Sequence, residues 1–306
     1  MSLIVHSNAK INLYLDVLER RRDGFTNIET VFQSVALYDT LEATPHAGDI
    51  TLECNAPGLP VDGRNLVLRA AKLLQAASGC DQGARLRLHK RIPIAAGLAG
   101  GSGNAAAALY LLNRLWGLDW PLARLLPLAG QLGSDVPFCL VGGTMLATGR
   151  GDRLEACLGA PPTCWTVLVH PPLQIGAGDL YASPQLTRNT EPRFAGRTAA
   201  FRAALRAFDK EFWSAFVFNR MESAAFAWHP ELAEIKASLL SAGCLAAAMS
   251  GSGPTIFGVC TDAASANAIA AKLSAGHRVN VAAFAPCGLE EEVAASHAGA
   301  QGETRE

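Results

Sequence analysis

The sequence predicts a globular protein that combines β-strands and α-helices in two parts, and three observations lead to this prediction. Residues 3–54 contain several short runs rich in alternating apolar residues, which is typical of strands. An alternating segment at 84–89 is followed by a glycine-rich turn and then by an alanine- and leucine-rich run with high helix propensity. Ala160-Pro161-Pro162 marks the expected boundary between the parts. We therefore expect a first domain over residues 1–160, a second over 161–290 and a flexible tail over 291–306.

The composition is that of a well-packed protein and excludes several other classes. Half of the 306 residues are hydrophobic and 17% are charged, which excludes a disordered chain. The net charge of −1 argues against a nucleic-acid or anionic-membrane surface. None of the eight cysteines forms a C-x-x-C pair, so we expect buried thiols and not a zinc site or disulfides. No apolar run reaches about 18 residues and no signal core is evident, so we expect a soluble, cytoplasmic protein.

The elements are placed along the chain by their periodicity and their turn residues. Asp23-Gly24 predicts a hairpin turn, and Asn65 should cap a helix that runs to about Ser78. Polar residues 187–197 should form a lid or a surface loop. We expect the remaining strands at 3–16, 28–36, 40–45, 49–54, 139–147, 164–169 and 278–285, and the remaining helices at 121–132, 199–218, 230–242 and 262–274.

The most informative stretch is the glycine-rich segment within residues 91–116. Gly97, Gly100, Gly101 and Gly103 fall within seven residues, ahead of a helix expected from Asn104. Glycine lets backbone N–H groups turn inward without a Cβ in the way, and a helix N-terminus adds unpaired N–H groups and the positive end of its dipole. Such a loop suits an anion, most often a phosphate. The alternative is a tight connection that binds no ligand.

Two common phosphate loops do not describe this segment. A Walker loop needs a lysine after its glycines, and none follows here. Gly101, Gly103 and Ala106 match the dinucleotide fingerprint only in part, and no acidic residue follows in a second strand about 20 residues on. The pattern that fits throughout is Pro93-x-x-x-Gly97-Leu98-x-x-x-Ser102-x-Asn104-Ala105-Ala106.

Charged residues interrupt apolar segments at two further places. Lys10 lies in a strand pattern, where a lysine more often faces solvent unless a charged partner waits inside. Asp135 follows the small residues Gly133 and Ser134 and precedes an apolar run. By itself Asp135 is a helix cap, a turn residue or a catalytic base. A second glycine cluster, Ser250-Gly251-Ser252-Gly253, lies far along the chain.

Taken together, these segments resemble the three motifs of the GHMP small-molecule kinases, a family named for galactokinase, homoserine kinase, mevalonate kinase and phosphomevalonate kinase. Lys10 with Asn12 matches the first motif, residues 93–106 match the second, and Ser250 to Gly253 match the third. The resemblance implies an α+β fold, with an N-terminal ribosomal-protein-S5-like domain and a C-terminal ferredoxin-like α/β sandwich. It also implies an ATP-dependent kinase that uses Mg²⁺, with the substrates bound in the cleft between the domains.

The resemblance assigns roles to individual residues. Asp135 would accept the proton of an alcohol, Lys10 would keep that carboxylate ionised, and Asn12 would fix the hydroxyl group. Ser102 would contact a phosphate or its Mg²⁺. The predicted ATP-binding residues are Asn65, Pro93, Gly97, Leu98, Ala99, Gly100, Gly101, Ser102, Gly103 and Asn104.

Within the family, the chain resembles members whose substrate is an alcohol linked to cytidine diphosphate, in the non-mevalonate route to isoprenoid precursors. The segments that carry this resemblance are 9–13, 23–25, 29–33, 65–67 and 132–138. Phe25 and Tyr181 would stack on the cytosine. Thr26 replaces the histidine usual in that group, Gly103 replaces a second serine, and residues 175–178 lack an expected serine or threonine.

Two other functions stay open. One is a GHMP kinase for another small alcohol, resembling homoserine, mevalonate or a sugar. The other is a non-catalytic ATP-binding regulator, although the lysine and the aspartate that catalysis needs are both present. For all of these we expect a small-molecule ligand, no nucleic-acid or membrane partner, and a monomer or homodimer.

Overall fold

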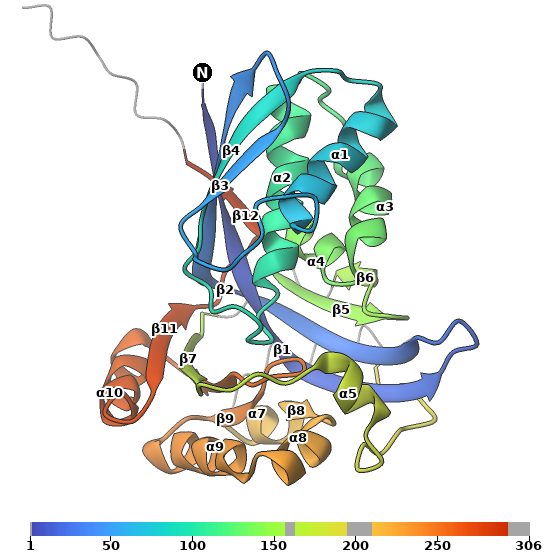
Figure 1. The fold of residues 1–306 in the computed structure, drawn as a ribbon. Helices are drawn as coiled ribbons and strands as arrows, with labels where there is room; N and C mark the ends of the chain where they lie inside the picture. The colour runs from blue at the N-terminus through green and yellow to red at the C-terminus, as the bar shows by residue number, and fades with distance from the viewer. Residues whose placement is uncertain (1, 157–162, 195–209, 293–306) are drawn as a thin grey trace, which may run out of the picture.

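The computed structural model describes residues 2–156, 163–194 and 210–292 of the chain. Within these ranges the strands form a sheet of eight and a sheet of four. Figure 1 shows the two sheets packed against each other, with one group of helices above and another below. This confirms the α+β class. Residues 293–306 of the expected tail, and residues 199–209 of one expected helix, lie outside the described residues.

A long antiparallel hairpin runs through the middle of the molecule. It consists of β1 (Leu3–Arg20) and β2 (Thr26–His46), joined by the predicted Asp-Gly turn. Two strands were expected over this range, but β2 is continuous. The pairing register shifts between Asn8 and Ala9 of β1, and this bulge accommodates the irregular residues between the two apolar runs of β2. In Figure 1 the hairpin crosses from the upper half to the lower right, so it contributes to both halves of the structure.

Helices cover one face of the first sheet. Strands β3 (Thr51–Cys54) and β4 (Gly83–His89) are parallel neighbours connected through α1 (Leu66–Ser78). Asn65 caps α1 as predicted, because its side chain accepts a hydrogen bond from the Val67 amide. The covering layer also contains α2 (Gly100–Leu115), α3 (Leu122–Leu132) and α4 (Val136–Val141).

Helix α2 begins at Gly100, four residues before the predicted start. Glycine propensity argues against a helix interior, but the first turn of a helix has unpaired N–H groups in any case. The Gly103 amide already donates to the Ala99 carbonyl at 2.8 Å. Gly100, Gly101 and Gly103 therefore lie within the first turn of the helix, and of the four glycines only Gly97 lies in the loop ahead of it. Further along, the run Ala105–Leu109 is fully buried, so α2 forms the centre of the core on this side.

The predicted strand over 139–147 is wrong in its first part. Residues up to Val141 belong to α4, and the strand β5 (Thr144–Thr148) starts later and pairs with β2 and with β6 (Arg153–Ala156). A short apolar run does not distinguish a buried helix from a strand. Two consecutive glycines, Gly142 and Gly143, separate the helix from the strand with positive φ angles.

The second sheet is antiparallel, and its strands follow the order β11 (Arg278–Ala283), β7 (Trp165–His170), β10 (Ile256–Cys260) and β9 (Ala246–Met249). One face packs on the helices α9 (Pro230–Ala242) and α10 (Ala263–Leu273). The other face supplies Leu168 and Phe257 to a cluster with Ile11 and Leu13 of β1. This cluster joins the two sheets.

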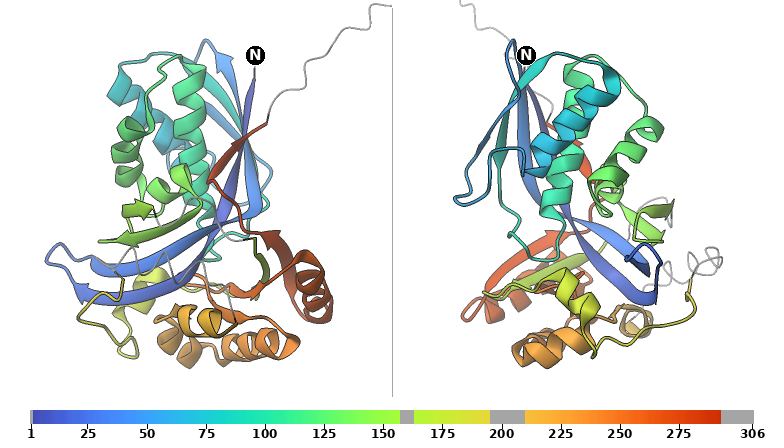
Figure 2. Two further views of the ribbon diagram at one scale, coloured as in Figure 1. Left: turned by 180° about the vertical axis from the view of Figure 1, so that it is seen from behind. Right: turned by 45° about the vertical axis from the view of Figure 1, so that its right-hand side comes forward.

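The later part of the chain returns twice to the first strand. Strand β8 (Phe218–Asn219) pairs parallel with β1, between α7 (Lys210–Phe216) and α8 (Glu222–Trp228). Strand β12 (Leu289–Glu291) pairs antiparallel with β1 at Val5 to Ser7. The last strand therefore belongs to the first sheet, although it follows the boundary expected near residue 160. Figure 2 shows this return from behind.

Candidate active site

Two neighbouring cavities share a wall made by the glycine segment. The first, of about 510 Å³, lies between the β1–β2 hairpin, the start of α4 and α5 (Ala177–Ala182). The second, of about 350 Å³, lies between the start of α2 and the start of α1. Gly97 and Ala99 line both. Groups bound in the two cavities would therefore meet at the glycine segment. After the ligands that the sequence leads us to expect there, we call the first the substrate cavity and the second the nucleotide cavity.

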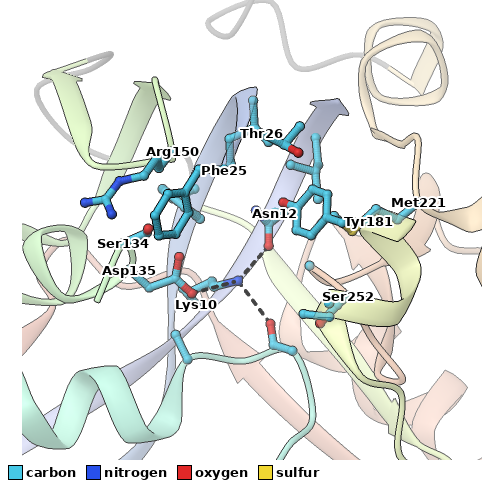
Figure 3. A pocket seen from close by; sticks show the side chains of 18 of the residues that line it. Lys10, Asn12, Phe25, Thr26, Ser134, Asp135, Arg150, Tyr181, Met221 and Ser252 are labelled. Atoms are coloured by element: carbon cyan, nitrogen blue, oxygen red, sulfur yellow. Dashed lines mark hydrogen bonds and ion pairs between the residues drawn. The ribbon is translucent and has the colours of Figure 1, made fainter. Parts of the chain in front are cut away.

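Lys10 is buried in the floor of the substrate cavity, with 4% of its side chain exposed. Its ammonium group donates to Asn12 Oδ1 at 2.8 Å and to the Gly97 carbonyl at 3.1 Å, and it lies 3.7 Å from Asp135 Oδ2. Figure 3 shows these three interactions as dashed lines that converge on one nitrogen. The solvent-facing position is excluded, because Lys10 has the charged partner that a buried lysine requires.

Asp135 occupies the N-cap position of α4 but, within the described chain, its side chain makes no capping hydrogen bond. Its carboxylate lines the substrate cavity and is about one-third exposed. Two neighbouring groups respond to this charge. Burial, and secondly the nearby Asp135 charge, raise the pKa of the Tyr181 hydroxyl and of the Cys139 thiol. The position combines access to the cavity with a cation beside the carboxylate, which suits a general base.

Asn12 lies between Lys10 and Thr30. Its Oδ1 accepts from Lys10, and its Nδ2 donates to Thr30 Oγ1 at 2.8 Å. The side chain still lines the cavity, as the predicted contact with a substrate hydroxyl requires. In this structure the Asn12 side chain holds the ammonium group of Lys10 in place.

The third glycine motif packs directly on Lys10 and on the glycine segment. Ser250 Oγ donates to the Gly97 carbonyl at 2.9 Å, the same oxygen that Lys10 contacts. A Cβ on Gly97 would lie 2.1 Å from the Ser250 carbonyl oxygen, so the close approach of these two loops requires glycine there. Gly251 and Ser252 line the substrate cavity, whereas Ser250 and Gly253 do not appear among its described lining residues.

Most predicted ATP-binding residues lie together around the nucleotide cavity, and these are Asn65, Pro93, Gly97, Leu98, Ala99, Gly100, Gly101, Ser102 and Asn104. Gly103 is absent from the described lining, because it packs against Ser7 and Asn8 of β1. The Asn104 amide is committed to Lys90, Asp39 and Ser7. In the first turn of α2, Gly101 is exposed, Gly100 and Ser102 are half-buried, and Gly103 is buried.

Asp39, which no sequence pattern indicated, holds the backbone that leads into the glycine segment. Asp39 is fully buried and accepts hydrogen bonds from the amides of Arg91 and Ile92 at 2.7 and 2.9 Å. It also forms an ion pair with Lys90 and accepts from Asn104. In the sequence Asp39 falls between two predicted strands, where an acidic residue is read as part of a turn.

Asn219 is a second residue that the sequence did not single out. Its Nδ2 donates to the Met249 and Gly251 carbonyls at 2.7 and 2.8 Å, on both sides of Ser250. Glu222 completes the support, because its carboxylate accepts from the Met249 amide. These contacts hold the third glycine motif against Lys10.

The other end of the substrate cavity is aromatic and cationic. Phe25 is 51% exposed, and the Asp23 carboxylate holds its backbone amide at 3.2 Å. The guanidinium group of Arg150 lies 4.7 Å from the centre of the Phe25 ring. Figure 3 places Phe25 and Tyr181 on either side of Asn12, with the Thr26 side chain above them. Arg20 and Arg150 both line this cavity.

The described residues contain no group of three or more His, Cys, Asp or Glu side chains that could hold a metal ion. All seven described cysteines are free thiols, as predicted, but only four of them are buried, because Cys54, Cys80 and Cys287 are half-buried. In the described ranges no helix has both the length and the apolar character needed to cross a bilayer.

The loop expected over 187–197 is described up to residue 194. Its Asn189 amide donates to the Val17 carbonyl, and the buried Glu29 carboxylate accepts from the Arg193 and Phe194 amides. The described part is therefore held against the hairpin, and residues 195–197 lie outside the described ranges.

Comparison with known proteins shows which family this chain resembles. Residues 65–143 match a family model described as the GHMP kinases N terminal domain, and residues 199–278 match one described as GHMP kinases C terminal. A Pelotomaculum thermopropionicum protein named 4-diphosphocytidyl-2-C-methyl-D-erythritol kinase is 46% identical over 89% of this chain and 94% of that protein. A Bacillus cereus protein of the same name is 41% identical over 85% of this chain and 88% of that protein.

Solved structures give the same result at the level of the fold. A crystal structure of 4-(cytidine 5'-diphospho)-2C-methyl-D-erythritol kinase matches with a TM-score of 0.76 and 33% identity, over 93% of this chain and 99% of that one. Homoserine kinase from Cytophaga hutchinsonii matches with a TM-score of 0.75 over 95% and 97% of the two chains, but at 23% identity this likeness concerns the fold alone. With family models in both halves and close relatives along most of its length, this chain belongs to the GHMP kinase family.

Proposed function

We propose that this chain transfers the γ-phosphoryl group of ATP to the 2-hydroxyl group of 4-diphosphocytidyl-2-C-methyl-D-erythritol, in the non-mevalonate route to isoprenoid precursors. Membership of the family makes it an ATP-dependent phosphotransferase. The observation that best supports the assignment of this substrate is the 46% identity to a kinase named for the compound. We also propose that the protein acts in the cytoplasm as a monomer or homodimer.

The geometry around Lys10 suits the chemical step. An alcohol is a poor nucleophile, and phosphoryl transfer is catalysed mainly by positioning and by charge stabilisation. Asp135 would accept the hydroxyl proton as the oxygen attacks the γ-phosphorus. Lys10, whose ammonium group lies 3.7 Å from that carboxylate, would stabilise the negative charge that develops on the oxygen.

The outer part of the substrate cavity suits a cytidine diphosphate group. The Arg150 side chain covers one side of Phe25, which leaves the other ring face for a base. Arg20 and Arg150 supply guanidinium groups, which are good donors to phosphate oxygens. Thr26 is half-buried in the same wall. Its hydroxyl group is shorter than an imidazole, so we expect backbone groups to take over much of the contact with the edge of the base.

The nucleotide cavity suits the triphosphate of ATP, because the first turn of α2 presents free N–H groups at Gly101 and Ser102. Mg²⁺ usually binds one or two protein groups and otherwise phosphate oxygens and water. The described residues fit this mode, because they offer the Ser102 hydroxyl and no carboxylate cage. Bound there, Mg²⁺ would neutralise charge on the phosphates.

A kinase for another small alcohol is the alternative, since homoserine and mevalonate kinases share the fold. A substrate panel with ATP, measured by ADP release, separates the two. The cytidylyl compound should have a kcat/KM at least about 100-fold above those of homoserine, mevalonate and galactose. Preference for one of the other alcohols would overturn the proposal. No ADP release with any alcohol would instead favour an ATP-binding regulator, although Lys10 and Asp135 lie together as a kinase needs.

A further inference from the structure

Three buried side chains form a single line of hydrogen bonds that ends at the reactive lysine. Thr30 lies on β2, opposite Leu15 of β1, and is fully buried. Its hydroxyl group donates to the Tyr14 carbonyl at 2.7 Å and accepts from Asn12 Nδ2 at 2.8 Å. Asn12 Oδ1 in turn accepts from Lys10 Nζ at 2.8 Å.

The direction of this line is fixed by the backbone at its far end. A hydroxyl group has one proton, and Thr30 gives that proton to the Tyr14 carbonyl, which can only accept. The Thr30 oxygen must therefore accept from its other neighbour. The NH₂ end of the Asn12 amide satisfies it, so the carbonyl end of the same amide faces Lys10.

The opposite orientation of Asn12 would disturb the site. A rotated amide would turn its NH₂ group toward an ammonium group that already carries three donors, and the two would repel. Lys10 would then lose one of its two neutral acceptors and keep only the Gly97 carbonyl beside Asp135. Leaving a buried donor without an acceptor costs free energy, so the ammonium group would shift from its present position.

We propose that Thr30 is a positioning residue for catalysis, which sets the orientation of the Asn12 amide and thereby the place of the Lys10 ammonium group. The inference rests on the proposed kinase function. Thr30 contacts neither cavity among the described lining residues, so its effect on substrates passes through Asn12 and Lys10.

The test compares Thr30→Val, Thr30→Ser and Thr166→Val with the unaltered protein. Valine keeps the shape of threonine but cannot orient the amide, whereas serine keeps the hydroxyl group. Thr166 is the matched control, because it is also fully buried and its hydroxyl group also donates to a backbone carbonyl, that of Gly258 at 3.0 Å, but in the second sheet.

Thr30→Val should lower kcat by about 10- to 100-fold while the KM for ATP stays within about twofold. Without the Thr30 hydroxyl group the Asn12 amide is no longer oriented, so the charged Lys10 ammonium group loses its hydrogen bond to Asn12 Oδ1. Thr30→Ser should keep most of kcat, and Thr166→Val should lower the melting temperature without lowering kcat. Should Thr30→Val fail to fold, Thr30→Ala, which only removes atoms, serves in its place with the same expected loss.

The inference is wrong if the variant without the hydroxyl group keeps more than half of the original kcat, or if Thr30→Ser loses as much as Thr30→Val. The rates are taken on whichever alcohol the unaltered protein phosphorylates. Failure of the cytidylyl compound as a substrate would therefore count against the proposed function and leave the comparison among Thr30 variants intact.

Discussion

The Lys10 ammonium group and the Gly97 carbonyl oxygen are joined by a hydrogen bond of 3.1 Å. The same oxygen accepts from Ser250 Oγ at 2.9 Å. Gly97 lies 87 residues from Lys10 and 153 residues from Ser250 along the chain, so one backbone carbonyl connects three distant motifs. The glycine segment therefore does more than border the nucleotide cavity, because it also holds Lys10, which lines the substrate cavity.

Replacing Asp135 should separate chemistry from binding. Asp135→Asn keeps the size of the side chain but cannot accept a proton at neutral pH, so kcat should fall by about 10²–10⁴-fold. ATP affinity, measured by calorimetry, should change little, because Asp135 lines the substrate cavity and not the nucleotide cavity. A variant that retains more than a tenth of the original kcat would show that another group is the base.

The role of the first turn of α2 can be tested with two helical glycines. A side chain at Gly101 has room in the protein, since the nearest atom to its Cβ position is Leu66 Cδ1 at 3.6 Å, but it would stand where phosphate should approach. Gly101→Val should raise the KM for ATP by about tenfold or more, if one hydrogen bond to phosphate is lost.

Gly130 in α3 is the control for this change, because the described residues leave open space around its Cβ position as well. Gly130→Val should leave the KM for ATP unaltered. Equal ATP affinity in the Gly101 and Gly130 variants, with both folded, would contradict the assignment of the nucleotide cavity.

Loss of the Phe25 ring should affect only substrates that carry a base. Stacking contributes about 1–3 kcal/mol per base, so Phe25→Ala should raise the KM for the cytidylyl compound by about tenfold or more. Phe25→Tyr keeps the ring and should behave like the original protein. The decisive comparison uses an alcohol that lacks the cytidine diphosphate group. An equal loss with both alcohols would mean that Phe25 does not contact cytosine.

His170 should make the stability of the second sheet sensitive to acid. Burial lowers the pKa of His170 from 6.5 to about 4, despite a hydrogen bond to Asn280 that favours the charged form. The unfolded chain takes up this proton first, so the stabilisation is complete above pH 6.5 and is lost as the pH falls toward 4. The full loss amounts to about 3 kcal/mol in the free energy of unfolding.

Urea unfolding of the original protein and of His170→Gln, at a series of pH values between 7 and 4, measures this contribution. The glutamine variant should be less sensitive to pH across that interval, because it has no proton to take up at this position. Parallel curves for the two proteins would rule out His170 as a source of acid sensitivity.

The parts of the site that consist of short, local sequence motifs could be predicted from the sequence. The motifs around Lys10, Gly97, Asp135 and Ser250 could be read directly, and the structure brings all four segments together at one cavity. Their order and spacing indicated the family, and the family determined the fold.

Residues that act through distant partners could not be found in this way. The contacts of Asp39 lie 52 and 53 residues away at Arg91 and Ile92, and those of Asn219 lie about 30 residues away. Thr30 looks like any other threonine in a strand until its two hydrogen bonds are known. Strand β12 was missed for the same reason, since its three residues form a strand only because β1 offers them an edge.

Direct identification of the phosphorylated product tests the central claim best. The protein is incubated with ATP, Mg²⁺ and 4-diphosphocytidyl-2-C-methyl-D-erythritol, and the products are examined by phosphorus nuclear magnetic resonance, with Asp135→Asn run in parallel. The account predicts a new phosphomonoester on the 2-hydroxyl group, with one ADP formed per ester, and almost none of it with the variant. An unchanged cytidylyl compound, in a preparation that phosphorylates homoserine or mevalonate, would contradict it.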